Sequence, residues 1–100
     1  MKTEQDIRDS LAVAGIPANT HDGVVRYLLH GVRPGSFLLA LFANDFVACC
    51  LRADDKNNGA LRDWAVWIIN HAPASCHGSH LAIDRWCAAR QAERKQEVQS

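Results

Sequence analysis

Residues 59–70 read Gly59-Ala60-Leu61-Arg62-Asp63-Trp64-Ala65-Val66-Trp67-Ile68-Ile69-Asn70. Four apolar residues of this run recur at helical spacing and would share one face of a helix: Leu61, Trp64, Ala65 and Ile68. Three further apolar residues fall outside that stripe: Val66, Trp67 and Ile69. A helix that is apolar on most sides is usually buried among other helices. We therefore expect a central, buried helix whose small solvated side is marked by Arg62, Asp63 and Asn70. Its two tryptophans are expected in the core rather than in a ligand-stacking platform.

The size and charge of the chain restrict its class. Its 100 residues suit one domain, and 48% of them are hydrophobic, enough for a core without disulfides or metals. Eleven Lys and Arg residues balance eleven Asp and Glu residues. A neutral chain lacks the basic surface that nonspecific nucleic-acid binding needs.

The sequence also predicts a cytoplasmic protein. Residues 1–6 are charged and precede no apolar stretch, unlike a signal peptide. The longest apolar run, from Phe37 to Ala43, is far shorter than the ~20 residues of a membrane span. In a reducing compartment the four cysteines would be free thiols: Cys49, Cys50, Cys76 and Cys87.

Helix caps and breakers divide the first half of the chain. Thr3 followed by acids predicts an accessory N-terminal helix within residues 1–18, about Thr3–Ala14, which Gly15 and Pro17 end. A second helix follows the cap candidates Asn19 and Thr20 and ends at Gly31. Ser36–Ala43 is expected as a short helix, Asn44 as a break and Asp45–Arg52 as another helix. One continuous helix over residues 36–52 is the alternative.

The second half contains two more predicted helices. Asp54 and Asp55 suit the start of the central helix, although residues 57–59 would allow that start to shift by a turn. Pro73 marks its end, and Ser79 would cap the last helix. The inner face of that last helix is expected to consist of Leu81, Ile83, Trp86 and Cys87. Residues 90–100 lack an apolar stripe and are expected as a solvated tail. The fold class is therefore all-α: a compact single-domain bundle of five or six short helices.

One cluster has metal-binding residue types: Cys76, His77, His80 and Cys87, with His71 nearby. Structural zinc sites usually combine two close ligand pairs separated by a longer loop, and this spacing is missing here. A cysteine nucleophile needs a base beside it, and nothing near Cys76 and His77 marks an oxyanion hole. We therefore expect no metal, no cofactor and no catalytic residue. Three function classes are considered: a protein-binding protein, a nucleic-acid-binding protein and an enzyme. The enzyme has the least support.

Several stretches resemble a family of small phage and prophage proteins. They are Pro34-Gly35-Ser36-Phe37-Leu38-Leu39-Ala40, Asn44-Asp45-Phe46, Arg52-Ala53-Asp54 with Asn58, Trp67-Ile68-Ile69-Asn70 before Pro73, and Cys76-His77-Gly78-Ser79. The resemblance covers roughly residues 23–86. The chain departs from the family pattern at His77 and at His80-Leu81. With its extra N-terminal helix it looks like an anti-CRISPR protein acting on the type I-F surveillance complex. That resemblance implies a protein in the cytoplasm of a bacterial host that binds Cas proteins of the crRNA-guided complex and stops target DNA from binding. We expect the domain itself to be a monomer.

Carboxylates are the candidate partner-binding residues, because Cas subunits hold nucleic acid with Lys and Arg. One group is expected to cluster near the break at Asn44: Asp45, Asp54 and Asp55. Another lines the N-terminal helix: Glu4, Asp6 and Asp9. The competing interpretation of both groups is helix capping and solubility.

A small helical nucleic-acid-binding phage regulator is the alternative function. The predicted helix before Gly31, the turn after it and the Ser36 helix have roughly the form of a helix-turn-helix. However, the Ser36 helix is almost entirely apolar, whereas a recognition helix must present polar side chains to base edges.

Overall fold

The computed structural model describes residues 3–99 and the side chains of residues 3–95. Within residues 3–99 it contains seven α-helices, two 3₁₀ turns and no strand, which confirms the all-α class. The helices outnumber the five or six predicted, because the central segment divides in two. Their bounds are α1 Glu4–Val13, α2 His21–His30, α3 Ser36–Phe42, α4 Phe46–Arg52, α5 Asp55–Gly59, α6 Leu61–His71 and α7 His80–Gln99. The 3₁₀ turns are η1 Ala18–Thr20 and η2 Ala74–Cys76.

The predicted helix caps are largely confirmed. Thr3 and Asp6 form a reciprocal capping box at α1, and Ser79 Oγ accepts a hydrogen bond from the backbone N–H of Ala82 in the first turn of α7. Thr20 is an exception: its hydroxyl donates to the carbonyl of Pro17 instead of capping α2.

The predicted break at Asn44 is also confirmed. Asn44 has φ 61°, in the left-handed region that Asn tolerates better than most residues. The Asp45 carboxylate then accepts a hydrogen bond from the Ala48 N–H at 3.3 Å and caps α4. The continuous helix considered for residues 36–52 is therefore wrong.

The expected start of the central helix is wrong as well. Asp54 caps the short helix α5 rather than the helix that carries the tryptophans, and it accepts a hydrogen bond from the Asn57 N–H at 2.8 Å. The chain leaves helical geometry at Ala60, where φ is −108°, and α6 begins at Leu61. The residues of low helix propensity at 57–59 thus end one helix instead of delaying the start of another.

Three tryptophans anchor the core, and each indole N–H has a partner. Trp64 donates to Asn57 Oδ1 at 3.1 Å, Trp67 to Ser10 Oγ at 2.9 Å and Trp86 to the carbonyl of Tyr27 at 3.1 Å. Because these bonds join different elements of the fold, the indoles both fill the core and fix how α1, α2 and α5–α7 meet.

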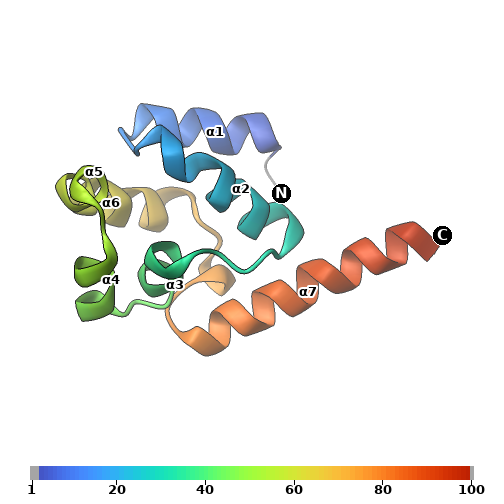
Figure 1. Ribbon diagram of the computed structural model, residues 1–100. Helices are drawn as coiled ribbons and strands as arrows, with labels where there is room; N and C mark the ends of the chain where they lie inside the picture. The colour runs from blue at the N-terminus through green and yellow to red at the C-terminus, as the bar shows by residue number, and fades with distance from the viewer. Residues whose placement is uncertain (1–2, 100) are drawn as a thin grey trace.

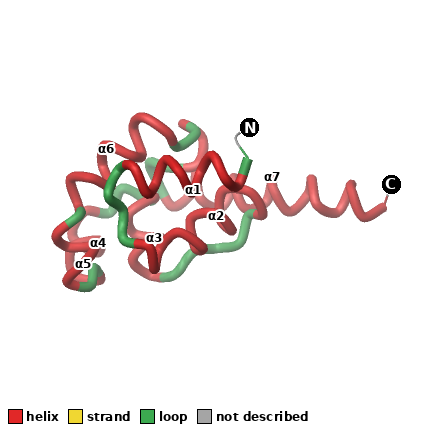
Figure 2. Tube along the Cα trace, turned by 90° about the horizontal axis from the view of Figure 1, so that it is seen from above, coloured by secondary structure: helices red, strands yellow, loops and turns green. Residues whose placement is uncertain are grey.

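The helices surround this core unequally (Figure 1). Helix α1 lies along α2 and contributes Ile7 and Leu11 to the core. Helix α2 crosses α7 at Gly31, where an added Cβ would lie 2.7 Å from Arg90 Cβ and from the Cys87 carbonyl oxygen. Seen from above, α7 continues past the other helices (Figure 2). Residues 90–99 therefore continue α7 as a helical extension, which is exposed at 91–95.

Burial of α6 differs from the prediction. Trp64, Trp67 and Ile68 are buried, whereas Ala65 is exposed and Ile69 is 78% exposed. The predicted stripe leaves out Trp67, but residues three apart share a side of a helix, so both tryptophans point inward. Because α6 lies at the edge of the domain, its other apolar side remains uncovered.

The expected inner face of α7 contains one error of the same kind. Ile83, Trp86 and Cys87 are buried, but Leu81 is 55% exposed. Leu81 and Ile83 are two residues apart, which places them about 200° apart around a helix. They cannot face the same core.

Candidate protein-binding surface

An open apolar groove lies between α4 and α6. Its volume is about 530 Å³, and its lining includes Leu41 of α3, Phe46 and Cys50 of α4, and Leu61, Ala65 and Ile69 of α6. We call it the α4–α6 groove. Phe46 is 75% exposed and Ile69 is 78% exposed, so both aromatic and aliphatic surface face solvent there.

Helix α4 is the main reason that this surface exists. Its sequence, Phe-Val-Ala-Cys-Cys-Leu-Arg, has no polar side chain before its last residue. Only Cys49 of this helix is buried, while Val47 is 66% and Leu51 is 80% exposed. No residue of α4 belongs to the buried core cluster of the described structure. An apolar helix attached mainly to α3 has no solvated face and therefore exposes hydrophobic side chains.

Asp45 is the predicted site residue that this surface includes. It belongs to the groove lining, together with Asn44 and His77. The capping bond to Ala48 orients its carboxylate, and its other oxygen, Oδ2, lies 3.9 Å from His80 Nε2. The side chain is 44% exposed, so the carboxylate remains accessible to a partner.

The other acids do not join Asp45. Asp54 and Asp55 lie beyond the C-terminal end of α4 and Asp45 at its N-terminal end, so a seven-residue helix of about 10 Å separates them. The expected cluster near the break at Asn44 is therefore wrong, because α4 is helical along its whole length and holds its flanking residues apart.

The carboxylates of α1 lie on another part of the molecule. Figures 1 and 2 place the start of α1 and the α4–α5 region at opposite sides. Glu4 pairs with Arg8 at 3.0 Å, Asp6 completes the capping box, and Asp9 accepts a hydrogen bond from Gln5 at 2.7 Å. These local interactions agree with the capping and solubility interpretation of the three residues.

Capping also explains the pKa of Asp54. The hydrogen bond from the Asn57 backbone N–H, which favours the charged form, lowers the pKa of this carboxyl below its ordinary 3.8. The same carboxylate oxygen accepts from the Asn57 side-chain amide at 3.0 Å. Because Asn57 in turn accepts the Trp64 N–H, this exposed acid is connected to the core through Asn57.

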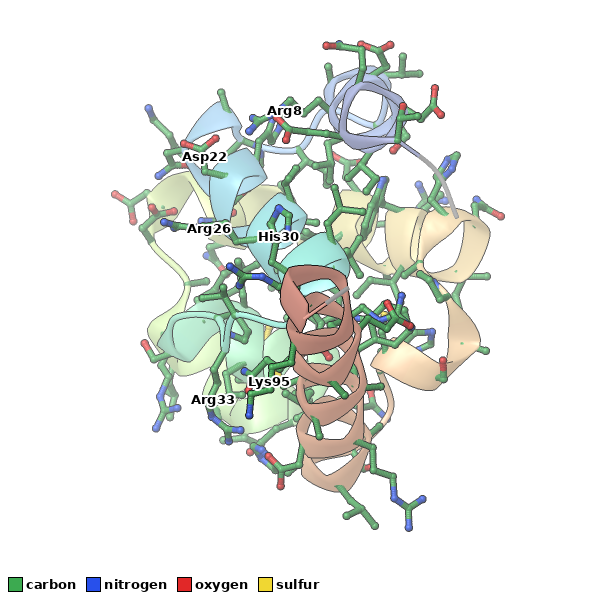
Figure 3. The ribbon with its side chains drawn as sticks, turned by 90° about the vertical axis from the view of Figure 1, so that its right-hand side faces the viewer. Arg8, Asp22, Arg26, His30, Arg33 and Lys95 are labelled. Atoms are coloured by element: carbon green, nitrogen blue, oxygen red, sulfur yellow. The ribbon has the colours of Figure 1, made fainter. Side chains whose placement is uncertain are left out.

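A second surface carries cations. Figure 3 shows Arg26 and His30 of α2, Arg33 after it and Lys95 of α7 on the side toward which α7 extends. Arg33 pairs with Asp84 at 2.6 Å. On the same side, Arg8 pairs with Asp22 at 2.8 Å (Figure 3). This surface, which we call the α2–α7 strip, is therefore partly neutralised.

The cysteine and histidine residues do not assemble into a site. Within the described residues, no group of three or more His, Cys, Asp or Glu side chains is placed to hold a metal ion. Cys76 is fully buried, and burial raises its thiol pKa to about 12. A thiol held protonated is a poor ligand and a poor nucleophile. His77 instead lines the α4–α6 groove, and His71 stacks on Trp67.

The helix-turn-helix interpretation gains no support from α3. Its residues Leu38, Ala40 and Phe42 are buried, so the side chains of this helix are used for packing.

The described helices also include none with the combination of length and hydrophobicity that a membrane span requires.

Comparison of the chain with protein-family models, curated proteins and solved structures found no match.

The groove residues Phe46, Ala65 and Ile69 do not stand out as a site in the sequence. One signal was available: residues 46–51 contain no polar side chain, so this helix must either be covered on all sides or expose apolar surface.

Proposed function

We propose that this protein is a binding protein without catalytic activity that inhibits the type I-F crRNA-guided Cas complex by preventing its association with target DNA. The partner is taken from the resemblance to phage proteins across residues 23–86. The structural observation that supports a binding role is the α4–α6 groove with the accessible Asp45 at its rim.

This chemistry suits association between proteins. Contiguous exposed apolar surface with a polar rim is typical of protein interaction sites. A carboxylate can in addition pair with the Lys and Arg residues that hold nucleic acid in such complexes. Binding of this kind is stoichiometric and needs a stable surface rather than reactive groups.

The direct test uses purified type I-F complex and labelled target DNA. Adding the protein in excess before the DNA should abolish the shifted DNA band, and the protein should co-elute with the complex in size-exclusion chromatography. Adding an unrelated small helical protein should leave DNA binding intact. If the protein neither co-elutes nor reduces DNA binding, the proposed function is wrong.

The nucleic-acid regulator remains the second candidate, and the α2–α7 strip favours it. Arg26 and Lys95 form no ion pair with another described side chain, so they could contact phosphates. A sequence-dependent shift of DNA or RNA by the protein alone would support this candidate over the first.

A further inference from the structure

We propose that the α4–α6 groove binds an amphipathic α-helix of the partner, with a Lys or Arg of that helix beside Asp45. The identity of the partner rests on the proposed function, whereas the type of segment bound is inferred from the groove.

The walls of the groove have the form of a helix-binding surface. Leu61, Ala65, Ile68 and Ile69 form a stripe along α6. From residue 61 to residue 69 this stripe is about 12 Å long, which corresponds to two turns of a bound helix. Phe46 and Cys50 of α4 line the groove as well. An amphipathic helix commonly fills such a groove with apolar anchors at positions i, i+3 or i+4, and i+7.

The exposure of two large lining side chains favours a helix over a small molecule. Phe46 and Ile69 line the groove and yet are 75% and 78% exposed. A small ligand between them would leave their outer surfaces in water. A helix, whose diameter with side chains is about 10–12 Å, presents far more surface to such exposed side chains than a small ligand does.

Charge determines which helix fits. Asp45 contributes a carboxylate to the lining, and its capping bond to Ala48 holds that group in place. Other lining residues include uncharged polar Asn44, the imidazole of His77 and apolar side chains. A cation on the incoming helix would pair with Asp45 at little additional cost in side-chain entropy, whereas an acid there would be repelled.

In a second copy of this chain, α4 is an exposed apolar helix, with Phe46, Val47 and Leu51 75%, 66% and 80% exposed, but Phe46 is itself part of the groove lining. On α7 up to Lys95, the large exposed apolar residue is Leu81 in the first turn, and the exposed apolar residues further along are Ala88, Ala89 and Ala92. On α1, the large exposed apolar residue is Val13, at the C-terminal end of the helix. Neither α7 nor α1 presents large anchors along two turns, and self-association through α4 is the outcome that the sedimentation measurement below tests.

The test compares matched variants for binding to purified type I-F complex. Ile69→Glu places a charge in the groove, and we expect a more than tenfold weaker Kd. Val66→Glu is the control, because Val66 is on the same helix and 44% exposed but does not line the groove. Asp45→Asn preserves helix capping, since Asn is an equally good N-cap, and should weaken binding three- to tenfold with a smaller salt dependence.

Site-specific photo-crosslinking from position 65 then identifies the occupant. We expect adducts to an α-helical segment of a Cas subunit that contains Lys or Arg. Adducts to nucleic acid or to a non-helical loop would overturn the inference, as would parental affinity of Ile69→Glu. If the parent binds the complex and Ile69→Glu binds it with the same Kd, the proposed function stands and this inference fails.

A separate measurement keeps the inference testable if the Cas complex does not bind. A twelve-residue helical peptide with Leu at positions i, i+4 and i+7 and a terminal Lys is titrated into the labelled protein and followed by NMR. Shifts should concentrate on Phe46, Cys50 and Ile69 and should weaken when Lys is replaced by Glu. Absence of shifts at these residues overturns the inference.

Sedimentation of the protein alone should give a monomer. A dimer that Ile69→Glu dissociates would overturn the inference and assign the groove to a second copy.

Discussion

Trp64 shows how one side chain connects packing with hydrogen bonding. It is fully buried, lies edge-on to Trp67 with ring centroids 6.2 Å apart, and donates its N–H to Asn57. Asn57 is one of the few buried polar residues, so each side chain satisfies the other.

Replacing Trp64 by Ala should therefore destabilise the protein severely. We expect a loss of about 3–5 kcal/mol in the free energy of unfolding, because a large cavity forms and Asn57 loses its partner. Urea denaturation followed by circular dichroism measures this. Val13→Ala, at a position 89% exposed, should have an unfolding curve close to that of the parent. Overlapping curves for Trp64→Ala and the parent would contradict the assignment of Trp64 to the core.

Burial also separates the reactivities of the four cysteines. Cys49, Cys76 and Cys87 are buried and Cys50 is half-buried at the groove; none forms a disulfide. Burial raises the pKa of the Cys49, Cys76 and Cys87 thiols. We expect iodoacetamide to modify Cys50 first in the native protein, and all four after denaturation, as measured by mass spectrometry of peptides. Early modification of Cys76 would contradict the described packing.

The crossing of α2 and α7 depends on Gly31. This residue has φ +67°, and any Cβ there would overlap α7 at 2.7 Å. The tight contact brings the Gly31 carbonyl to the side-chain amide of Gln91 at 3.0 Å. Glycine is therefore required for both its backbone conformation and its size.

Gly31→Ala should be destabilising. The left-handed conformation alone costs a residue with a Cβ about 1–2 kcal/mol, and the overlap with α7 adds to this. Gly59→Ala is the matched control, because a Cβ added there would meet no atom within 4 Å and the residue belongs to a helix. Thermal denaturation should show a lower Tm for the first variant and an unchanged or higher Tm for the second. Equal melting temperatures would mean that the helices can separate without penalty.

The cap of α5 should make part of the stability depend on pH. The Asp54 pKa is lower in the folded protein than its ordinary 3.8, so its stabilising effect is present above that value. The effect is lost as pH falls below 3.8 and through the folded pKa. Asp54→Asn keeps a capping oxygen but does not titrate. We expect the urea midpoint of this variant to fall less between about pH 5 and about pH 2.5 than that of the parent. Parallel pH profiles would show that this carboxylate is not coupled to folding.

At the level of surfaces, the two candidate functions use different sides of the domain. The α4–α6 groove is apolar with one carboxylate, whereas the α2–α7 strip carries Arg26 and Lys95 among paired charges. Substitutions on either side can therefore be made without altering the other.

The proposed inhibitor should not bind DNA appreciably by itself. The chain has no net charge, and two cations on the side of the strip, Arg8 and Arg33, are paired with acids. We expect fluorescence anisotropy with a DNA duplex at physiological salt to give a Kd no tighter than the ~10⁻⁴–10⁻⁶ M of nonspecific binding. The double variant Arg26→Ala and Lys95→Ala should inhibit the Cas complex as well as the parent. Tight DNA binding that this double variant abolishes would instead favour the regulator.

The sequence by itself predicted the elements well, because their signals are local. Helices are capped by Thr3, Asp45 and Ser79, each of which accepts a bond from the backbone N–H three residues later, and Asp6 completes the box at Thr3. Asn44 interrupts the helical segment through its own backbone preference. The all-α class, most helix boundaries and the core position of the tryptophans follow from such short-range patterns.

The location of the candidate site, by contrast, depended on which helices have neighbours. Periodicity shows that α6 has apolar residues on several sides, but only the arrangement of the other helices leaves Ile69 exposed and buries Trp67. Likewise, Asp45 and Asp54 look similar as caps, yet packing places the first beside a groove while the second supports the core through Asn57. Burial is a property of contacts between distant segments. Local sequence therefore specified the helices, and their packing determined which apolar side remained free for a partner.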